Sequence, residues 1–61
     1  MILDVRYKSK APEQLQGVRR HTVYFNSEDG IPEVVIHFKE FDKPTVWIAI
    51  SELDHITVTN D

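Results

Sequence analysis

Apolar and polar residues alternate along most of this chain, and this period of two constrains its fold more than any other feature. In residues 2–8, Leu3, Val5 and Tyr7 fall on one side of an extended chain, and charged residues fall on the other. Four further segments, residues 18–25, 33–41, 45–50 and 55–59, are rich in β-branched and aromatic residues, which favour strands over helices. The pattern predicts five strands.

Two short segments between these strands predict local turns. Pro12 and Gly17 stand where a helix would begin and stop, so we expect one helical turn or a polar loop there. The segment Ser51-Glu52-Leu53-Asp54 is typical of a tight turn or a single 3₁₀ turn, with Ser51 as its cap and Leu53 in the core.

The order of strands, with a short turn before a short last strand, resembles SH3-like small barrels in outline. This resemblance concerns architecture and implies no particular function. We predict one mostly β domain over residues 1–61. It is a small antiparallel five-stranded meander, a curved sheet or an SH3-like barrel, with at most one short helical turn near residues 12–16.

The dipeptide Asp29-Gly30 predicts the register of the first long hairpin. A type I′ turn needs positive φ at both central residues, and Asp-Gly is favoured there. A two-residue loop at this position pairs Phe25 with Val34 and Val23 with Ile36. The apolar residues of both strands then meet on one face.

Hydrophobic parity, the requirement that alternating apolar residues of paired strands share one face, predicts the register of the next hairpin. Phe38 is expected opposite Val46 and Ile36 opposite Ile48, with Pro44 at a position where no ladder donor is needed. On the other face, the two predicted registers place three rows of residues side by side across the strands. These rows are Tyr24, Val35 and Ala49; Thr22, His37 and Trp47; and Arg20, Lys39 and Thr45. An aromatic and basic patch is therefore expected on the face away from the core.

Six residues of this region are the candidate binding residues: Trp47, His37, Tyr24, Arg19, Arg20 and Lys39. Trp47 is the only tryptophan, and two interpretations of it stand side by side. It is buried by the N-terminal segment or a second copy, or it is an exposed anchor for a partner, a role in which Trp, Tyr and Arg are enriched.

The chain has 61 residues and no cysteine, which makes an unaided fold marginal and excludes disulfides and thiolate metal sites. Self-association is then the common remaining way to add stability. The longest apolar run, residues 46–50, is far shorter than the ~20 residues of a membrane helix, and the first residues do not resemble a signal peptide. We expect a cytoplasmic protein without a membrane partner.

Charge is distributed unevenly along the chain. Residues 1–25 hold five basic and two acidic residues, whereas residues 26–61 hold two basic and eight acidic ones. Oppositely charged strands that lie side by side explain this distribution, and so does a polarity used in recognition.

The histidines and carboxylates do not form a recognisable reactive pattern. The predicted register places His21 and His37 on opposite faces, and His55 follows a turn, so no metal site is expected. Ser51, Asp54 and His55 are too close in sequence to build a triad. We expect no catalytic residue, no metal and no cofactor.

These observations favour a small non-enzymatic protein-interaction module that forms a homo-oligomer. The small size also fits an accessory protein of a phage or mobile element. The alternative is a domain that binds single-stranded nucleic acid, with basic residues for the phosphates and aromatic residues for base stacking.

Overall fold

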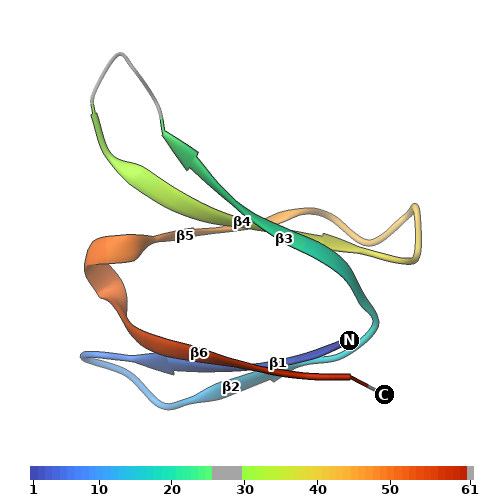
Figure 1. Cartoon of the computed structure of the whole chain (residues 1–61), viewed down its shortest axis with the longest axis horizontal. Helices are drawn as coiled ribbons and strands as arrows, with labels where there is room; N and C mark the ends of the chain where they lie inside the picture. The colour runs from blue at the N-terminus through green and yellow to red at the C-terminus, as the bar shows by residue number, and fades with distance from the viewer. Residues whose placement is uncertain (26–29, 61) are drawn as a thin grey trace.

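The computed structural model describes residues 1–25 and 30–60. The elements in chain order are β1 (Ile2–Tyr7), β2 (Glu13–Leu15), β3 (Val18–Phe25), β4 (Pro32–Phe38), β5 (Val46–Ala49), the 3₁₀ turn η1 (Ile50–Glu52) and β6 (Leu53–Thr59). They form two antiparallel three-stranded sheets, ordered β2-β1-β6 and β3-β4-β5, which lie as two layers in Figure 1. The predicted mostly β fold is confirmed.

The segment predicted as a helical turn or loop forms β2 instead. Leu15 pairs with Leu3 of the central strand β1, so the pairing and burial of one apolar side chain outweigh the helix start and stop signals. Gly17, at a φ of 68°, follows β2 and lets the chain pass from one sheet to the other. The backbone is tied there by a mutual pair of hydrogen bonds between Met1 and Val18.

The turn predicted after β5 is confirmed as η1, and β6 begins directly behind it. Leu53 packs against the core, as expected. Ser51 lies within the turn, and the N-cap residue Ala49 makes no side-chain cap bond, so the predicted Ser51 cap is wrong.

The core lies between the two sheets. Its buried members are Leu3, Val5, Val18, Val34, Ile36, Phe38 and Ile48. Partly buried residues from β2, β6 and η1, such as Leu15, Ile56 and Ile50, pack around it. Alternate residues of β1 and β4 supply most of this core, which is what the period of two predicts.

The register of the β3–β4 hairpin differs from the prediction by two residues. Phe25 pairs with Pro32, and Val23 pairs with Val34, so the predicted Phe25–Val34 pair is wrong. Gly30 has a φ of 69°, while Asp29, the other half of the predicted turn, lies outside the described residues.

The β4–β5 pairing is shifted by the same amount. Val34 pairs with Ile48 and Ile36 with Val46, so the predicted Ile36–Ile48 pair is also wrong. A shift of two residues leaves the side chains of residues 20–25, 32–38 and 46–49 on their predicted faces, because side chains alternate with a period of two. Val18 is the exception, since the irregularity between Val18 and Arg20 turns it into the core. Hydrophobic parity therefore predicts the faces correctly and leaves the register open.

Within the described residues, no helix is long and apolar enough to span a membrane.

Candidate binding surface

The outer face of the β3-β4-β5 sheet points away from the other sheet and carries the predicted aromatic and basic residues. Val34, Ile36 and Phe38 of β4 are buried in the core, so the intervening residues of β4 face outward. The observed pairing gives three rows on this face: Arg20 and His37; Thr22, Val35 and Trp47; Tyr24, Glu33 and Ala49. The three predicted rows are thus wrong in their members across β4, although those members that lie in β3, β4 and β5 are on the predicted face. Lys39 and Thr45 lie outside these strands.

Tyr24 and Trp47 form an aromatic cluster on this face. Their ring centroids are 5.7 Å apart with an interplanar angle of 86°, an edge-to-face arrangement. The two residues come from β3 and β5, the strands on either side of β4, and their contact crosses β4 diagonally, from the partner of Tyr24, Glu33, to the partner of Trp47, Val35. Val35 is only 4% exposed, although it lies on the face opposite the core cluster.

Both aromatic side chains remain half exposed, Tyr24 at 51% and Trp47 at 52%. The N-terminal segment lies in the opposite sheet and does not cover Trp47. Of the two sequence-based interpretations, burial of Trp47 by the chain's own N-terminus is therefore wrong. An exposed anchor and burial by a second copy stay predictions.

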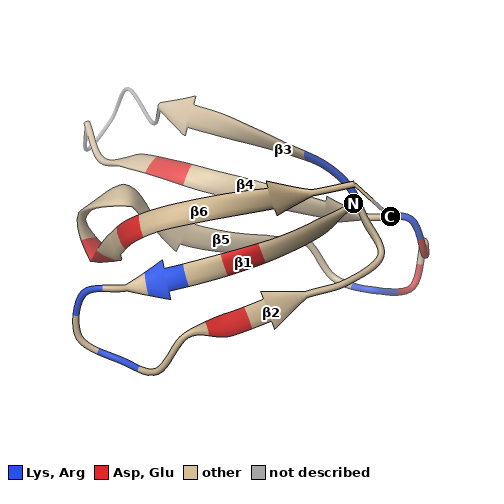
Figure 2. Ribbon diagram, turned by 60° about the horizontal axis from the view of Figure 1, so that its bottom comes forward, with Lys and Arg blue, Asp and Glu red and all other residues tan. Residues whose placement is uncertain are grey.

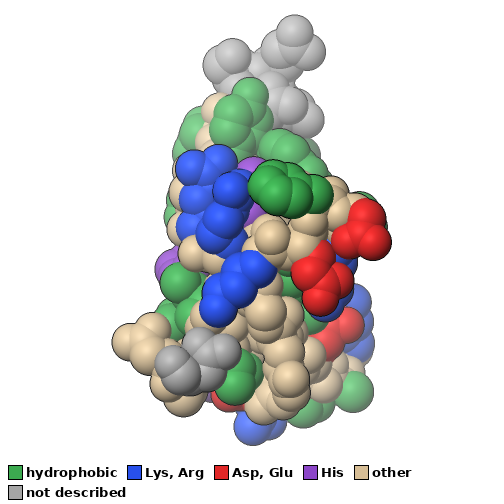
Figure 3. Space-filling model, turned by 90° about the vertical axis from the view of Figure 1, so that its right-hand side faces the viewer, with side chains coloured by type: hydrophobic (Ala, Val, Ile, Leu, Met, Phe, Trp, Pro, Cys, Tyr) green, Lys and Arg blue, Asp and Glu red, His purple; other side chains and the backbone are tan. Residues whose placement is uncertain are grey.

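A β-bulge places the two arginines next to the histidine. Val18 pairs with Phe38 and Arg20 with His37, so Arg19 is the extra residue of β3. Arg19 and Arg20 are both exposed and together stand opposite His37. Figure 3 shows basic side chains gathered on one side of the molecule, with a histidine between them and hydrophobic side chains next to them.

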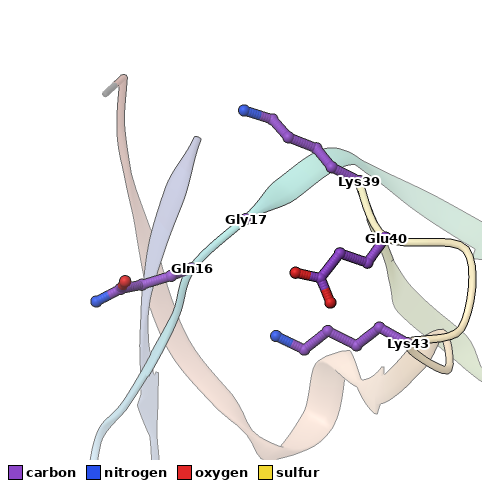
Figure 4. A pocket seen from close by; sticks show the side chains of 5 residues that line it. All are labelled: Gln16, Gly17, Lys39, Glu40 and Lys43. Atoms are coloured by element: carbon purple, nitrogen blue, oxygen red, sulfur yellow. The ribbon is translucent and has the colours of Figure 1, made fainter.

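Lys39 follows β4 directly and continues this basic region. Its backbone N–H donates to the Gly17 carbonyl at 2.9 Å, which fixes the end of β4 against the passage between the sheets. Together with Gln16, Gly17, Glu40 and Lys43 it lines a shallow pocket of about 330 Å³. Its side chain extends in a different direction from those of Glu40 and Lys43, as Figure 4 shows.

The pocket itself has mixed charge. The Glu40 side chain lies on the same side of the loop as the Lys43 side chain (Figure 4), and the Lys43 Nζ stands 4.4 Å above the centre of the Phe38 ring. This cation–π contact covers one end of the core. A carboxylate and a lysine already engaged with Phe38 make the pocket a poor anion site.

Glu33 is a member of the surface that sequence reasoning missed. The observed register places it beside Tyr24, where the predicted register places Val35. It brings a negative charge to the end of the surface opposite the arginines. Figure 2 likewise shows acidic and basic residues in both sheets, so the uneven charge along the sequence does not separate into two poles.

The inner side of β3 is a second apolar surface that sequence reasoning placed in the core. Val23 pairs with the buried Val34 and points to the same side, yet it is 66% exposed, and Phe25 is 67% exposed. The β3–β4 hairpin rises away from the other sheet in Figure 1, so nothing among the described residues covers its far end.

The described ionisable residues outside this surface interact at most in small groups, such as Tyr7 with Glu13 and Asp54 with His55. Among the described residues, no group of three or more His, Asp or Glu is placed to hold a metal ion. His21 and His37 lie on opposite faces of the sheet, and His55 of β6 lies 3.5 Å from the Asp54 carboxylate. Burial, and then a hydrogen bond to Glu13, raise the pKa of Tyr7 to about 12.

Comparisons with protein-family models, with curated proteins and with solved structures find no match to this chain.

Proposed function

We propose that this chain is a small non-enzymatic protein-interaction module of the cytoplasm, which associates with a second copy of itself. The observation that carries this proposal is the aromatic cluster. Tyr24 and Trp47 hold each other in a fixed edge-to-face arrangement, and half of each side chain is left in water. Rigid, partly exposed aromatic side chains are the usual energetic centres of protein interfaces.

The surroundings of the cluster support a protein partner. The arginines lie at one end of the face and Glu33 at the other, so a protein surface of matching polarity finds both signs of charge within one site. Val35, which pairs with Trp47 and is buried, adds an apolar residue on the same face. Fully desolvated apolar centres with a charged rim are typical of protein interfaces.

The alternative function, binding of single-stranded nucleic acid, rests on the same face. Arg19, Arg20 and Lys39 suit phosphates, and Trp47 suits base stacking. Glu33 beside Tyr24 opposes it, since a carboxylate there repels the backbone of a strand stacked on the cluster. The net charge of −3 opposes it as well.

Replacement of Trp47 tests the interface. Trp47→Ala should weaken self-association by about 2 kcal/mol or more, roughly 30-fold in Kd, measured by sedimentation equilibrium. Phe41→Ala is the matched control, because Phe41 is 100% exposed and lies outside the outer face. Equal association of parent, Trp47→Ala and Phe41→Ala would contradict the proposal.

The effect of salt concentration on binding distinguishes self-association from nucleic-acid binding. Trp47 is the only tryptophan, so its fluorescence reports directly on titration with single-stranded DNA or RNA. For a protein interface we expect no saturable quenching by either strand and little effect of salt on self-association. Quenching whose affinity falls steeply with salt, with a smaller slope in Arg19→Ala or Arg20→Ala, would favour nucleic acid instead.

A further inference from the structure

Strand β3 is the long open edge of its sheet. Among the described residues, the order β3-β4-β5 leaves one side of β3 without a neighbouring strand, apart from Val18 at its start, which is bonded to Met1. Residues 20–25 follow the bulge without interruption and contain no proline or lysine, the residues that commonly protect an edge. They form a template for another strand.

The other edge strands within the described part of the chain are less suited to pairing. β2 has three residues and β5 has four. β6, like β3, has a bulge, and its regular part after Asp54 is residues 55–59, whose outer side carries the polar residues His55, Thr57 and Thr59. β3, in contrast, exposes Val23 and Phe25 on one side and Tyr24 on the other.

The sequence of β3 is complementary to itself in the antiparallel direction. Its first half is basic, with Arg19, Arg20 and His21, and its second half is apolar, with Val23, Tyr24 and Phe25. Antiparallel pairing of two β3 strands places the basic half of each against the aromatic half of the other. Parallel pairing places like charges together, which is destabilising.

We propose that two copies of this chain join their β3 edges in antiparallel fashion about a two-fold axis at Thr22, forming one continuous six-stranded sheet. This inference rests on the proposed self-association: the β3 edges join the two copies, and Trp47 contributes by packing against Tyr24, the ring at that edge. The partner is a second copy of this chain, because the charge pattern of β3 complements its own reverse. A two-fold axis is the usual symmetry of such assemblies.

The register centred on Thr22 follows from the outer face. It sets Arg20 of each copy opposite Tyr24 of the other, where a guanidinium stacks on an aromatic ring. Glu33 lies next to Tyr24 in the same row, so the arriving arginine also meets a carboxylate. On the inner side, His21 comes opposite Val23 and covers part of its exposed surface.

Neighbouring registers lack these contacts. A centre at His21 sets the two His21 side chains against each other and moves Arg20 away from Tyr24. A centre at Val23 carries Arg20 beyond the end of β3, because the strand finishes at Phe25. Only the Thr22 centre uses all of residues 20–24 symmetrically.

A single introduced cysteine tests this register, because the chain has none of its own. Opposed Cα atoms in antiparallel strands lie about 4.5–5.5 Å apart, within the range a disulfide spans. Thr22→Cys should therefore form a disulfide-linked dimer under mild oxidation. Thr57→Cys, at an exposed threonine on the β6 edge, is the control and should form no disulfide-linked dimer under the same oxidation. Failure of Thr22→Cys to cross-link, or equal cross-linking of both variants, would overturn the proposal.

A matched pair of valines tests the edge without a covalent bond. Val23→Lys places a charge opposite His21 of the second copy and should weaken dimerisation at least tenfold. Val58→Lys, at a 45% exposed valine of β6, should leave it unchanged. Sedimentation equilibrium measures both against a parent mass of twice the 7.1 kDa chain, and circular dichroism checks that both variants stay folded.

The outcomes separate this proposal from the proposed function. A parent that dimerises, loses association on Trp47→Ala, and keeps it on Val23→Lys would overturn the β3 edge while the interaction surface stands. A parent that stays monomeric at millimolar concentration would overturn the β3 pairing. Binding of another protein in a Trp47-dependent manner would then still support the interaction surface.

Discussion

Strands β1 and β3 have similar sequence patterns and opposite environments. In β1, Leu3 and Val5 alternate with polar residues and are fully buried. In β3, Val23 and Phe25 have the same spacing and point to the same side as the core, yet two thirds of each side chain is exposed. β1 is the centre of its sheet, covered by the other sheet, whereas β3 is an edge whose end extends past that cover.

The difference shows what an alternating pattern encodes. A period of two predicts a strand with one apolar side, and it holds for both strands. Whether that side is covered depends on what packs over it, and β1 is covered within the chain while β3 is not. An apolar side left uncovered in a 61-residue domain is where a second molecule gains most by binding.

The largest expected effect lies on the covered side. Leu3→Ala or Ile36→Ala should reduce the free energy of unfolding by about 2–5 kcal/mol, because each leaves a cavity at a fully buried position. Domains have about 0.05–0.15 kcal/mol of stability per residue, about 3–9 kcal/mol for 61 residues, so either substitution should remove a large part of the total. Urea titration followed by circular dichroism measures this. A variant that melts within a few degrees of the parent would remove the contrast between β1 and β3.

The pKa of Tyr7, at the end of β1, measures how well this strand is shielded from water in comparison with β3. Its hydroxyl donates to the Glu13 Oε1 at 2.9 Å, and burial first, then this bond and the charges of Glu13 and Glu52, raise its pKa to about 12. In the unfolded chain the pKa is the ordinary 10.0. The contribution of Tyr7 to the free energy of unfolding is therefore complete below pH 10 and is lost as the pH rises towards 12. In that interval the tyrosine hydroxyl releases its proton only in the unfolded chain.

The absorbance of tyrosinate in a Tyr24→Phe background, where Tyr7 is the only tyrosine, measures this titration directly. Glu13→Gln in the same background should lower the pKa of Tyr7, because the hydrogen bond to a carboxylate and its charge are removed. Titration of Tyr7 near its ordinary value in the Tyr24→Phe protein would show that the end of β1 is as open to water as β3.

The smallest effect is expected on the uncovered side. Val23→Ala should change the free energy of unfolding of the monomer by no more than about 0.5 kcal/mol, because the side chain already lies largely in water. The measurement belongs at a dilution where the chain is monomeric, so that an association energy does not enter. A loss above 1 kcal/mol would mean that the hairpin folds over Val23 and that β1 and β3 are equivalent after all.

Part of the candidate surface could be predicted from the sequence. Parity alone places Tyr24 and Trp47 on one face, and the structure brings their rings into contact. The bulge at Arg19 and the place of Glu33 beside Tyr24 could not be predicted, since both depend on how β3 is aligned with β4.

The sequence by itself determined the strands, their faces and the turn before β6, because local propensity and the alternation of side chains are properties of the chain alone. The register was decided by tertiary structure. Registers that differ by two residues keep every side chain on its face, and only packing of Val34, Ile36 and Ile48 against the other sheet separates them. Tertiary structure likewise made residues 13–15 a strand and left Val23 uncovered, because burial depends on what lies opposite a residue, which no local pattern records.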